Sequence, residues 1–250
     1  MISATAPLVT RSAAGQVVRS VIWGEPVYFT ITNPRDTIQR QHYAGQFYEP
    51  EELEIIRQWC QPGAVFCDIG ANIGNHAIFA LKFLRPAEVI LFEPNPVAIA
   101  VLLSNLELNG VMDRCDLAHL GIGLSDHETA GMSVVAPGRN LGAGRLVHTG
   151  GTLEVRRGDS MLAGRHVDFL KIDVEGMEIR VLEGLAATIA ASRPKIFVEV
   201  DRTNRAAFAA WSKANGYAAR ARFRRYRANE NFLMVPQDTD AAHEADDATP

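Results

Sequence analysis

The chain has 250 residues, with 25 Lys and Arg against 29 Asp and Glu, so its net charge is −4 and it has no strong field to hold nucleic acid. Its 47% hydrophobic and 22% charged residues exclude a disordered or fibrous chain. Because no apolar run approaches the roughly 18 residues of a membrane helix and no signal-peptide pattern opens the chain, we expect a cytoplasmic protein without a membrane partner. The three cysteines show no metal-ligand spacing.

The N-terminal part predicts a hairpin followed by two helices. Two β-rich runs between Val17 and Thr32 flank the turn-forming residues Trp23 to Pro26. A helix is expected from about Asp36 to Gly45, and a second starts near Pro50 with acidic residues in its first turn. We interpret residues 1–62 as an extension on the substrate side of a domain that spans residues 63–236.

Strands and helices then alternate, which predicts an α/β fold with a parallel sheet. The strands are expected at Val65 to Ile69, Val89 to Phe92, Leu117 to Leu124, Val167 to Ile172 and Lys195 to Val200. The helices are expected at Ala77 to Phe83, Val97 to Leu108, Gly176 to Ile189 and Asn204 to Asn215. Strands that are apolar throughout, as these are, indicate a sheet covered on both faces.

Three segments depart from this alternation. Thr129 to Arg165 is rich in glycine and predicts an inserted loop near the site, with short β segments at Met132 to Val135 and Leu153 to Arg156. Tyr217 to Tyr226 and Phe232 to Val235 predict a closing antiparallel hairpin. The acidic residues 237–250 predict a disordered tail.

A glycine loop and an acid predict an adenosyl site. Asp68 to Gly74 reads DIGANIG at a transition from strand to helix, where backbone amides approach a ligand closely. Glu93 ends the next strand, in the position of a carboxylate that binds ribose hydroxyls. A dinucleotide site needs a glycine where Asn72 stands, and Asp68 repels a pyrophosphate, so S-adenosylmethionine fits better than NAD.

Further acids end the fourth and fifth strands. Asp173, Glu175, Glu199 and Asp201 are expected at the carboxyl edge of the sheet, where open α/β sheets bind ligands. Capping and helix-dipole roles explain Asp201 and Glu178 well, and they explain Asp173 poorly because it ends an apolar strand.

With these motifs in this order, the sequence resembles the FkbM family of S-adenosylmethionine-dependent methyltransferases. The likeness runs from about Phe47 to Val235, and its most specific part is Lys171-Ile172-Asp173-Val174-Glu175-Gly176, followed by Leu182-Glu183-Gly184. The resemblance implies a class I methyltransferase (Rossmann-like) fold, a mostly parallel seven-stranded sheet with helices on both faces and a final antiparallel strand.

The resemblance also implies roles for individual residues. Those implied to hold the cofactor are Asp68, Gly70, Asn72 and Gly74 at the methionine end, Glu93 at the ribose, Ser125 and Asp126 beside the adenine, and Glu49. Asp173 and Glu175 are implied to face the transferred methyl group. Since family members of known activity mainly methylate hydroxyls, the resemblance implies an O-methyltransferase acting on a small molecule, a sugar or a glycan.

The reaction needs a base for the acceptor hydroxyl. Asp173 is the first candidate and Glu199 the second, while His76 is more typical of a packing or capping residue. A divalent cation such as Mg²⁺, held by Asp173 and Glu199, is an alternative way to lower the hydroxyl pKa.

Three other functions remain open. Five arginines between Arg220 and Arg227 raise the alternative of an RNA methyltransferase, which the net charge and the scarcity of stacking aromatic residues disfavour. A nicotinamide-dependent oxidoreductase is disfavoured by Asp68 and Asn72. A non-catalytic adenosyl-binding module would be expected to lack the acids at the sheet edge.

Overall fold

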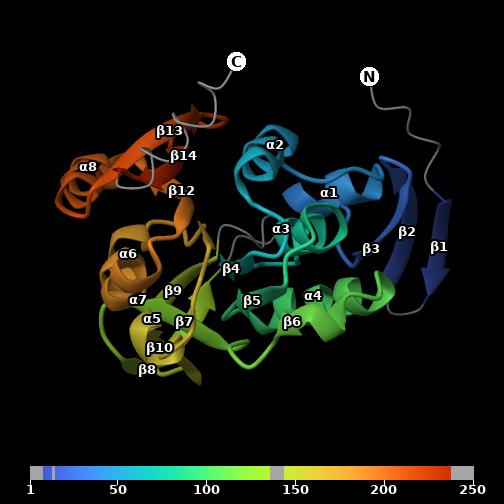
Figure 1. The fold of residues 1–250 in the computed structure, drawn as a ribbon. Coiled ribbons are helices and arrows are strands. Elements are labelled where there is room, and N and C mark those ends of the chain that lie inside the picture. The colour runs from blue at the N-terminus through green and yellow to red at the C-terminus, as the bar shows by residue number, and fades with distance from the viewer. Residues whose placement is uncertain (1–7, 13–14, 136–143, 238–250) are drawn as a thin grey trace, which may run out of the picture.

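The computed structural model describes residues 8–12, 15–135 and 144–237. Seven strands form the main sheet, in the spatial order β13-β14-β12-β11-β4-β5-β6 (Figure 1). In chain order they are β4 (Val65–Ile69), β5 (Glu88–Phe92), β6 (Cys115–Asp116), β11 (Phe169–Ile172), β12 (Lys195–Asp201), β13 (Tyr217–Phe223) and β14 (Asn229–Pro236). The neighbours from β6 to β12 pair in parallel, and β14 is antiparallel to both β12 and β13. The predicted fold class is confirmed.

Helices cover both faces of this sheet (Figure 1). They are α1 (Thr37–Tyr43), α2 (Pro50–Trp59), α3 (Asn75–Phe79), the π-helix η1 (Ala80–Leu84), α4 (Pro96–Leu108), α5 (Gly158–Met161), α6 (Glu178–Gly184), α7 (Ala186–Ser192) and α8 (Arg205–Ala214). Short 3₁₀ turns are η2 (Met112–Arg114) and η3 (Arg202–Asn204).

The two faces explain why the strands are apolar throughout. Phe66 of β4 packs in one core with residues of α2, α3 and α4, whereas its neighbour Cys67 packs in a second core with residues of α6, α7 and α8. Successive side chains of a strand point to opposite faces, so a strand between two helical layers needs an apolar residue at every position.

The N-terminal segment adds a small antiparallel sheet of β1 (Leu8–Ser12), β2 (Gly15–Ile22) and β3 (Glu25–Ile31). The predicted hairpin is confirmed, and its turn is the pair Trp23 and Gly24, both with positive φ. The side chain of Asn109, the C-cap of α4, binds both the backbone N–H and the carbonyl of Tyr28, at 3.0 and 2.7 Å. The small sheet therefore packs against the helical layer that covers one face of the main sheet.

The third predicted strand, Leu117 to Leu124, is wrong. In the main sheet this position is taken by the two-residue β6, and the chain then turns and begins β7 (Ile122–Ser125) in another sheet. Gly121 has a φ of +90° and donates its N–H to the carbonyl of Glu93. This turn interrupts the apolar run, because a left-handed residue does not continue a strand.

The glycine-rich insertion builds a second sheet, in the order β7-β10-β8-β9, that borders the carboxyl edge of the main sheet. Its other strands are β8 (Thr129–Val135), β9 (Arg145–His148) and β10 (Leu153–Arg157). The two predicted β segments are found as β8 and β10. Residues 136–143 of the predicted loop and 238–250 of the predicted tail lie outside the described residues.

The helix predicted from Gly176 to Ile189 is two helices, α6 and α7, that meet at Leu185. A Cβ on Gly184 would lie 2.0 Å from the carbonyl oxygen of Ser125, so the chain approaches β7 too closely there for a side chain. The helix also begins later than predicted, because Glu175 and Gly176 both have positive φ and form a turn.

Candidate active site

A cavity that is open to solvent lies at the carboxyl ends of β4, β5 and β11. Five of the predicted site residues line it, namely Gly70, Asn72, Glu93, Asp173 and Glu175. The second sheet contributes an apolar wall with Ile122, Leu124, Val134 and Leu146. The other predicted site residues, which are outside the lining, are Glu49, Asp68, Gly74, Ser125, Asp126 and Glu199.

The glycine loop is shaped mainly by close packing. A Cβ on Gly70 would lie 1.9 Å from the carbonyl oxygen of Asp173, and one on Gly74 would lie 2.6 Å from the side chain of Leu102. Both glycines have positive φ, as does Asn72. The loop thus follows a path that L-residues rarely adopt, and this path brings its backbone to the cavity between β4 and β11.

Glu93 is held in place by backbone amides on both sides. Its Oε2 accepts from the N–H of Asn72 at 2.8 Å, and its Oε1 accepts from the N–H of Asn95 at 2.7 Å. Burial raises the pKa of Glu93 to about 7, against the lowering effect of these two hydrogen bonds. Because each carboxylate oxygen has further acceptor capacity, Glu93 is suited to accept from the two hydroxyls of a ribose.

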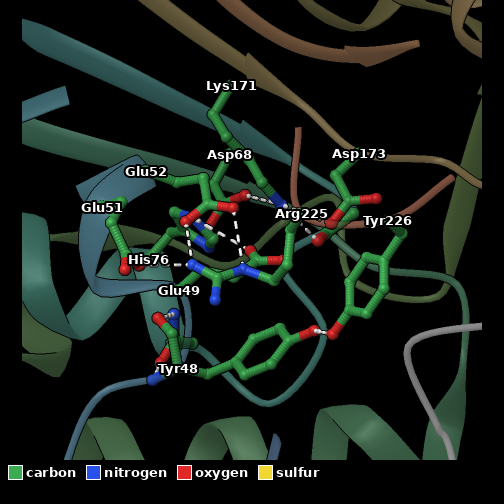
Figure 2. Close-up of polar contacts among 12 residues, drawn as sticks. Tyr48, Glu49, Glu51, Glu52, Asp68, His76, Lys171, Asp173, Arg225 and Tyr226 are labelled. Carbon is green, nitrogen blue, oxygen red and sulfur yellow. Dashed lines mark hydrogen bonds and ion pairs between the residues drawn. The ribbon is translucent and has the colours of Figure 1, made fainter. Parts of the chain in front are cut away.

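Lys171 is a site residue that the sequence interpretation missed. Its ammonium group lies 3.0 Å from Asp68 and 3.8 Å from Asp173, and it donates to the carbonyl of Gly70 at 2.8 Å (Figure 2). A lone lysine inside an apolar strand was the available signal, since a buried charge requires a partner. Asp68 is fully buried beneath the glycine loop and faces this lysine.

Three carboxylates gather at the edge of the sheet. One oxygen from each of Asp173, Glu175 and Glu199 lies within 4.8 Å of the others. Burial, reinforced by the charge of Asp173, raises the pKa of Glu175 to about 7 and that of Glu199 to about 10. Three of the four acids predicted at this edge therefore meet, and Glu199 keeps a proton at neutral pH. The fourth, Asp201, instead caps η3 and accepts from the N–H of Thr203 at 2.8 Å.

Glu49 approaches this group from the N-terminus of α2. It has a φ of 58°, and burial together with the charge of Asp173 raises its pKa to about 8. Its Oε2 lies 3.9 Å from Nε2 of His76, whose pKa burial lowers well below the ordinary value. A neutral His76 of α3 and a largely buried Glu49 of the N-terminal segment thus form one side of the site.

Two tyrosines join the N-terminal segment to the closing hairpin. The hydroxyls of Tyr48 and Tyr226 are 2.8 Å apart (Figure 2). Close by, the guanidinium of Arg225 binds the fully buried Glu52, at 3.0 and 2.6 Å, and also Glu51. The turn between β13 and β14 is therefore fastened to the start of α2 beside the acids.

Ser125 and Asp126 lie at the end of β7, next to the cavity-lining Leu124. Ser125 is fully buried and donates its hydroxyl to Asp126 at 2.8 Å, and Asp126 pairs with His127 at 2.7 Å. A contact that the sequence did not indicate is the stacking of His119 on Phe92, with ring centroids 4.6 Å apart. Phe92 lines the cavity, so this stack supports its apolar wall.

The sheet order, the antiparallel β14, the glycine loop after β4 and the acid after β5 define a class I methyltransferase fold. The profile of the methyltransferase FkbM domain matches residues 68–227, which is more than half of the chain. The chain therefore belongs to the FkbM family of S-adenosylmethionine-dependent methyltransferases.

Individual relatives are similar over parts of the chain. Hexuronic acid methyltransferase AglP of Haloferax volcanii is 29% identical over 145 residues, covering 55% of this chain and 56% of that protein. The tRNA wybutosine-synthesizing protein 2 homolog of Bos taurus is 43% identical over 95 residues, covering 37% of this chain and 20% of that protein. The chain thus spans about a fifth to about half of the length of these two relatives.

Among solved structures, the Streptococcus pneumoniae protein Sp1610 in complex with S-adenosyl-L-methionine aligns with a TM-score of 0.50. Its sequence identity is 14%, and the alignment covers 74% of this chain and 72% of that one, so the likeness concerns the fold. Among the described residues, the helices are all too short or too polar to cross a membrane.

Proposed function

We propose that the protein transfers a methyl group from S-adenosylmethionine to a hydroxyl oxygen of a small molecule, a sugar or a glycan. The observation that carries this proposal is the position of Glu93 and Asp173 in the lining of one cavity. The cofactor, when bound, supplies an electrophilic sulfonium methyl group. The protein then has to orient the two reactants and to remove the proton of the acceptor hydroxyl.

The charges around the cavity suit this cofactor better than a dinucleotide. Glu93, Asp173 and Glu175 line the cavity, and the nearby Lys171 is already paired with Asp68. Such an excess of carboxyl groups favours the sulfonium and ammonium groups of S-adenosylmethionine. The same excess repels the pyrophosphate of NAD, which disfavours the oxidoreductase alternative.

In this proposal each part of the cofactor has its own group of residues. Gly70 and Asn72 provide backbone at the methionine end, and Gly74 fixes the path of the loop. Glu49 offers a mostly protonated carboxyl group on this side, because its pKa is about 8, whereas Asp68 lies beneath the loop and is paired with Lys171. Glu93 accepts hydrogen bonds from the ribose hydroxyls. Ser125 and Asp126 lie on the adenine side, where Phe92 and Leu124 supply an apolar wall.

Asp173 is the proposed base. Its side chain is 35% exposed toward the cavity that it lines, and its Oδ2 lies 3.8 Å from the ammonium of Lys171. Glu199 is the weaker candidate because its pKa of about 10 leaves it protonated at neutral pH. Glu175, with a pKa of about 7, is placed to position the acceptor hydroxyl beside Asp173.

A second mechanism for the same reaction uses a divalent cation. Asp173, Glu175 and Glu199 offer oxygen atoms within 4.8 Å of one another, and Mg²⁺ prefers such hard ligands. A cation held there would lower the pKa of the acceptor hydroxyl. A chelator distinguishes the two mechanisms, because a cation-dependent enzyme loses activity and regains it with Mg²⁺, whereas a carboxylate base is indifferent.

RNA is the second candidate acceptor, favoured by the relatives that are named for tRNA. Two observations weigh against it. Arg225 is engaged by Glu51 and Glu52, and Arg224 pairs with Glu230 at 3.3 Å, so the arginine-rich strand has fewer guanidinium groups to offer a phosphate backbone. The carboxyl groups of the site repel phosphates as well.

The proposal is tested by methyl transfer from labelled S-adenosylmethionine. Neutral sugars, uronic acids, hydroxylated metabolites, amines and tRNA are offered as acceptors, each with and without chelator. The proposal expects label on a hydroxyl oxygen of a small molecule or glycan, with much slower labelling by Asp173→Asn. Label on tRNA or on an amine, with none on any hydroxyl compound, would refute O-methylation.

A further inference from the structure

Lys171 occupies the interior of β11, where its side chain is 3% exposed. Both flanking residues, Leu170 and Ile172, are fully buried and apolar. Placing an ammonium group in such surroundings costs several kcal/mol unless opposite charges and acceptors surround it. The contacts of Lys171 therefore have to account for its presence in the strand.

The partners of Lys171 come from two neighbouring strands. Asp68 of β4 stands directly opposite Lys171 in the parallel register, and the two side chains form an ion pair of 3.0 Å. The same ammonium group donates to the carbonyl of Gly70 at 2.8 Å and lies 3.8 Å from Asp173 (Figure 2). Lys171 thus connects the glycine loop to the end of β11.

Asp68 has no surface toward the cavity. Its side chain is 0% exposed and is absent from the cavity lining, although the adjacent Ile69 and Gly70 belong to it. Neither of its carboxylate oxygens has a hydrogen-bond partner among the described residues, and its Oδ1 forms the ion pair with Lys171. A carboxylate in this position acts on its surroundings through Lys171.

The glycine loop is held from its other side by β5. The N–H groups of Gly70 and Ala71 both donate to the carbonyl of Phe92, at 2.9 and 3.0 Å, and that of Asn72 donates to Glu93. These bonds fix the donors of the loop. The hydrogen bond from Lys171 fixes the carbonyl of Gly70, which the bonds from β5 leave free.

We propose that Asp68 and Lys171 are positioning residues for the methionine end of the cofactor. Asp68 holds the ammonium of Lys171, and Lys171 holds the Gly70 carbonyl, so the loop keeps its place against Asp173. Asp68 then exerts its effect through the loop and makes no contact with the cofactor. This inference rests on the proposed function, because it assigns the methionine end of S-adenosylmethionine to this loop.

Two variants separate this role from a direct contact. Asp68→Asn keeps an oxygen for Lys171, leaves the bond to Gly70 in place, and leaves Asp173, at 3.8 Å, as the counter-charge of the ammonium. Asp68→Asn/Lys171→Met removes both charges together and frees the Gly70 carbonyl. The double variant is preferred to Lys171→Met alone, because losing one partner of a buried pair leaves an uncompensated charge, whereas replacing both is often tolerated.

Calorimetric titration with two ligands provides the measurement. S-adenosylhomocysteine has the amino-acid part, and 5′-methylthioadenosine has the same nucleoside and sulfur without it. The double variant is expected to bind S-adenosylhomocysteine at least about tenfold more weakly, as the loss of a charge-assisted hydrogen bond implies. Its affinity for 5′-methylthioadenosine, and the affinity of Asp68→Asn for both ligands, should stay within about threefold of the unaltered protein.

Three results would overturn the inference. A loss of about tenfold in Asp68→Asn, with loop exchange rates equal to those of the unaltered protein, would contradict a role that acts only through Lys171 and the loop. Equal losses of affinity for both ligands in the double variant would show a general structural role. Unchanged affinity for both ligands would show that the pair has no part in cofactor binding. If the unaltered protein binds neither ligand, the proposed function fails.

Hydrogen exchange of the loop amides then tests the positioning role of Asp68 and Lys171 without any ligand. The loop amides should exchange faster in the double variant than in Asp68→Asn, and equal rates would contradict the positioning role.

Discussion

Gly70 and Asp173, which follow two neighbouring strands, approach so closely that a Cβ on Gly70 would lie 1.9 Å from the carbonyl oxygen of Asp173. The backbone N–H of Asp173 donates to the carbonyl of Ile69 at 3.0 Å, so the contact is part of the sheet register. The loop proposed for the cofactor and the residue proposed as the base are therefore fixed relative to each other by backbone contacts.

Gly70→Ala tests this contact, and Gly63→Ala is its matched control. Both glycines have a φ near +80°, but a Cβ on Gly63 would meet nothing within 4 Å. The left-handed conformation alone costs roughly 1–2 kcal/mol for an L-residue. Urea unfolding should show about this loss for Gly63→Ala and a clearly larger one for Gly70→Ala, which should also lose S-adenosylmethionine binding. Equal losses of stability in the two variants would show that the close approach of Gly70 to Asp173 does not add to the cost of a side chain there.

Arg225→Met should destabilise the protein through Glu52. Glu52 is fully buried, and the guanidinium of Arg225 is bound to it through two hydrogen bonds. Breaking a buried ion pair by removing one partner costs about 3 kcal/mol or more, and replacing both partners is far less costly. The double variant Arg225→Met/Glu52→Gln should therefore regain most of the lost stability. Arg222→Met, on the exposed side of β13, is the control and should leave the stability nearly unchanged. An unchanged urea midpoint in Arg225→Met would contradict the inferred contact.

The raised pKa of Glu199 makes the stability of the folded protein depend on pH. Its folded pKa of about 10 lies above the ordinary value of 4.5, because burial and nearby carboxylates disfavour its charge. Relative to high pH, Glu199 contributes its full stabilisation below pH 4.5, its ordinary pKa, where both states are protonated. This contribution declines as the pH rises toward 10, because the unfolded chain releases the proton of Glu199 while the folded chain retains it. The melting temperature of Glu199→Gln should fall less between about pH 6 and pH 9 than that of the unaltered protein. Glu107→Gln, on the exposed side of α4, is the control, and parallel pH profiles for Glu199→Gln and the unaltered protein would contradict the shift.

Much of the fold followed from local sequence. The apolar runs at Val65 to Ile69 and Val89 to Phe92, each followed by a helix, predicted β4 and β5 to within a residue. The path of the chain after β6 could not be predicted from local sequence. Leu117 to Leu124 is apolar enough for a strand, and its turn at Gly121 depends on a hydrogen bond to the distant Glu93. The break between α6 and α7 likewise depends on contact between Gly184 and β7.

The candidate site was predicted only in part. The order of the motifs led to Gly70, Asn72, Glu93 and the acids at the sheet edge, because strand ends are visible in a sequence. The pairs that organise these residues were not visible. Lys171 meets Asp68 only once β4 and β11 are known to be neighbours, and Tyr48 meets Tyr226 across 178 residues of sequence.

Asp173→Asn tests the proposed base. The variant should keep its affinity for S-adenosylmethionine within about tenfold while turnover falls by on the order of 10²-fold, the usual contribution of a general base. Glu199→Gln should reduce turnover less, since Glu199 already carries a proton at neutral pH. Single-turnover methyl transfer to an identified acceptor provides the measurement. Full activity in Asp173→Asn would place the base elsewhere.

The central claim is that the cavity at the carboxyl edge of the sheet binds S-adenosylmethionine through Glu93. Calorimetric titration of the unaltered protein and of Glu93→Ala with S-adenosylmethionine, S-adenosylhomocysteine and NAD tests it most directly. We expect the unaltered protein to bind the first two and not NAD, and Glu93→Ala to bind them more weakly by roughly 2–3 kcal/mol, the contribution of two charge-assisted hydrogen bonds. Binding of NAD with comparable affinity, or unchanged binding in Glu93→Ala, would contradict the account.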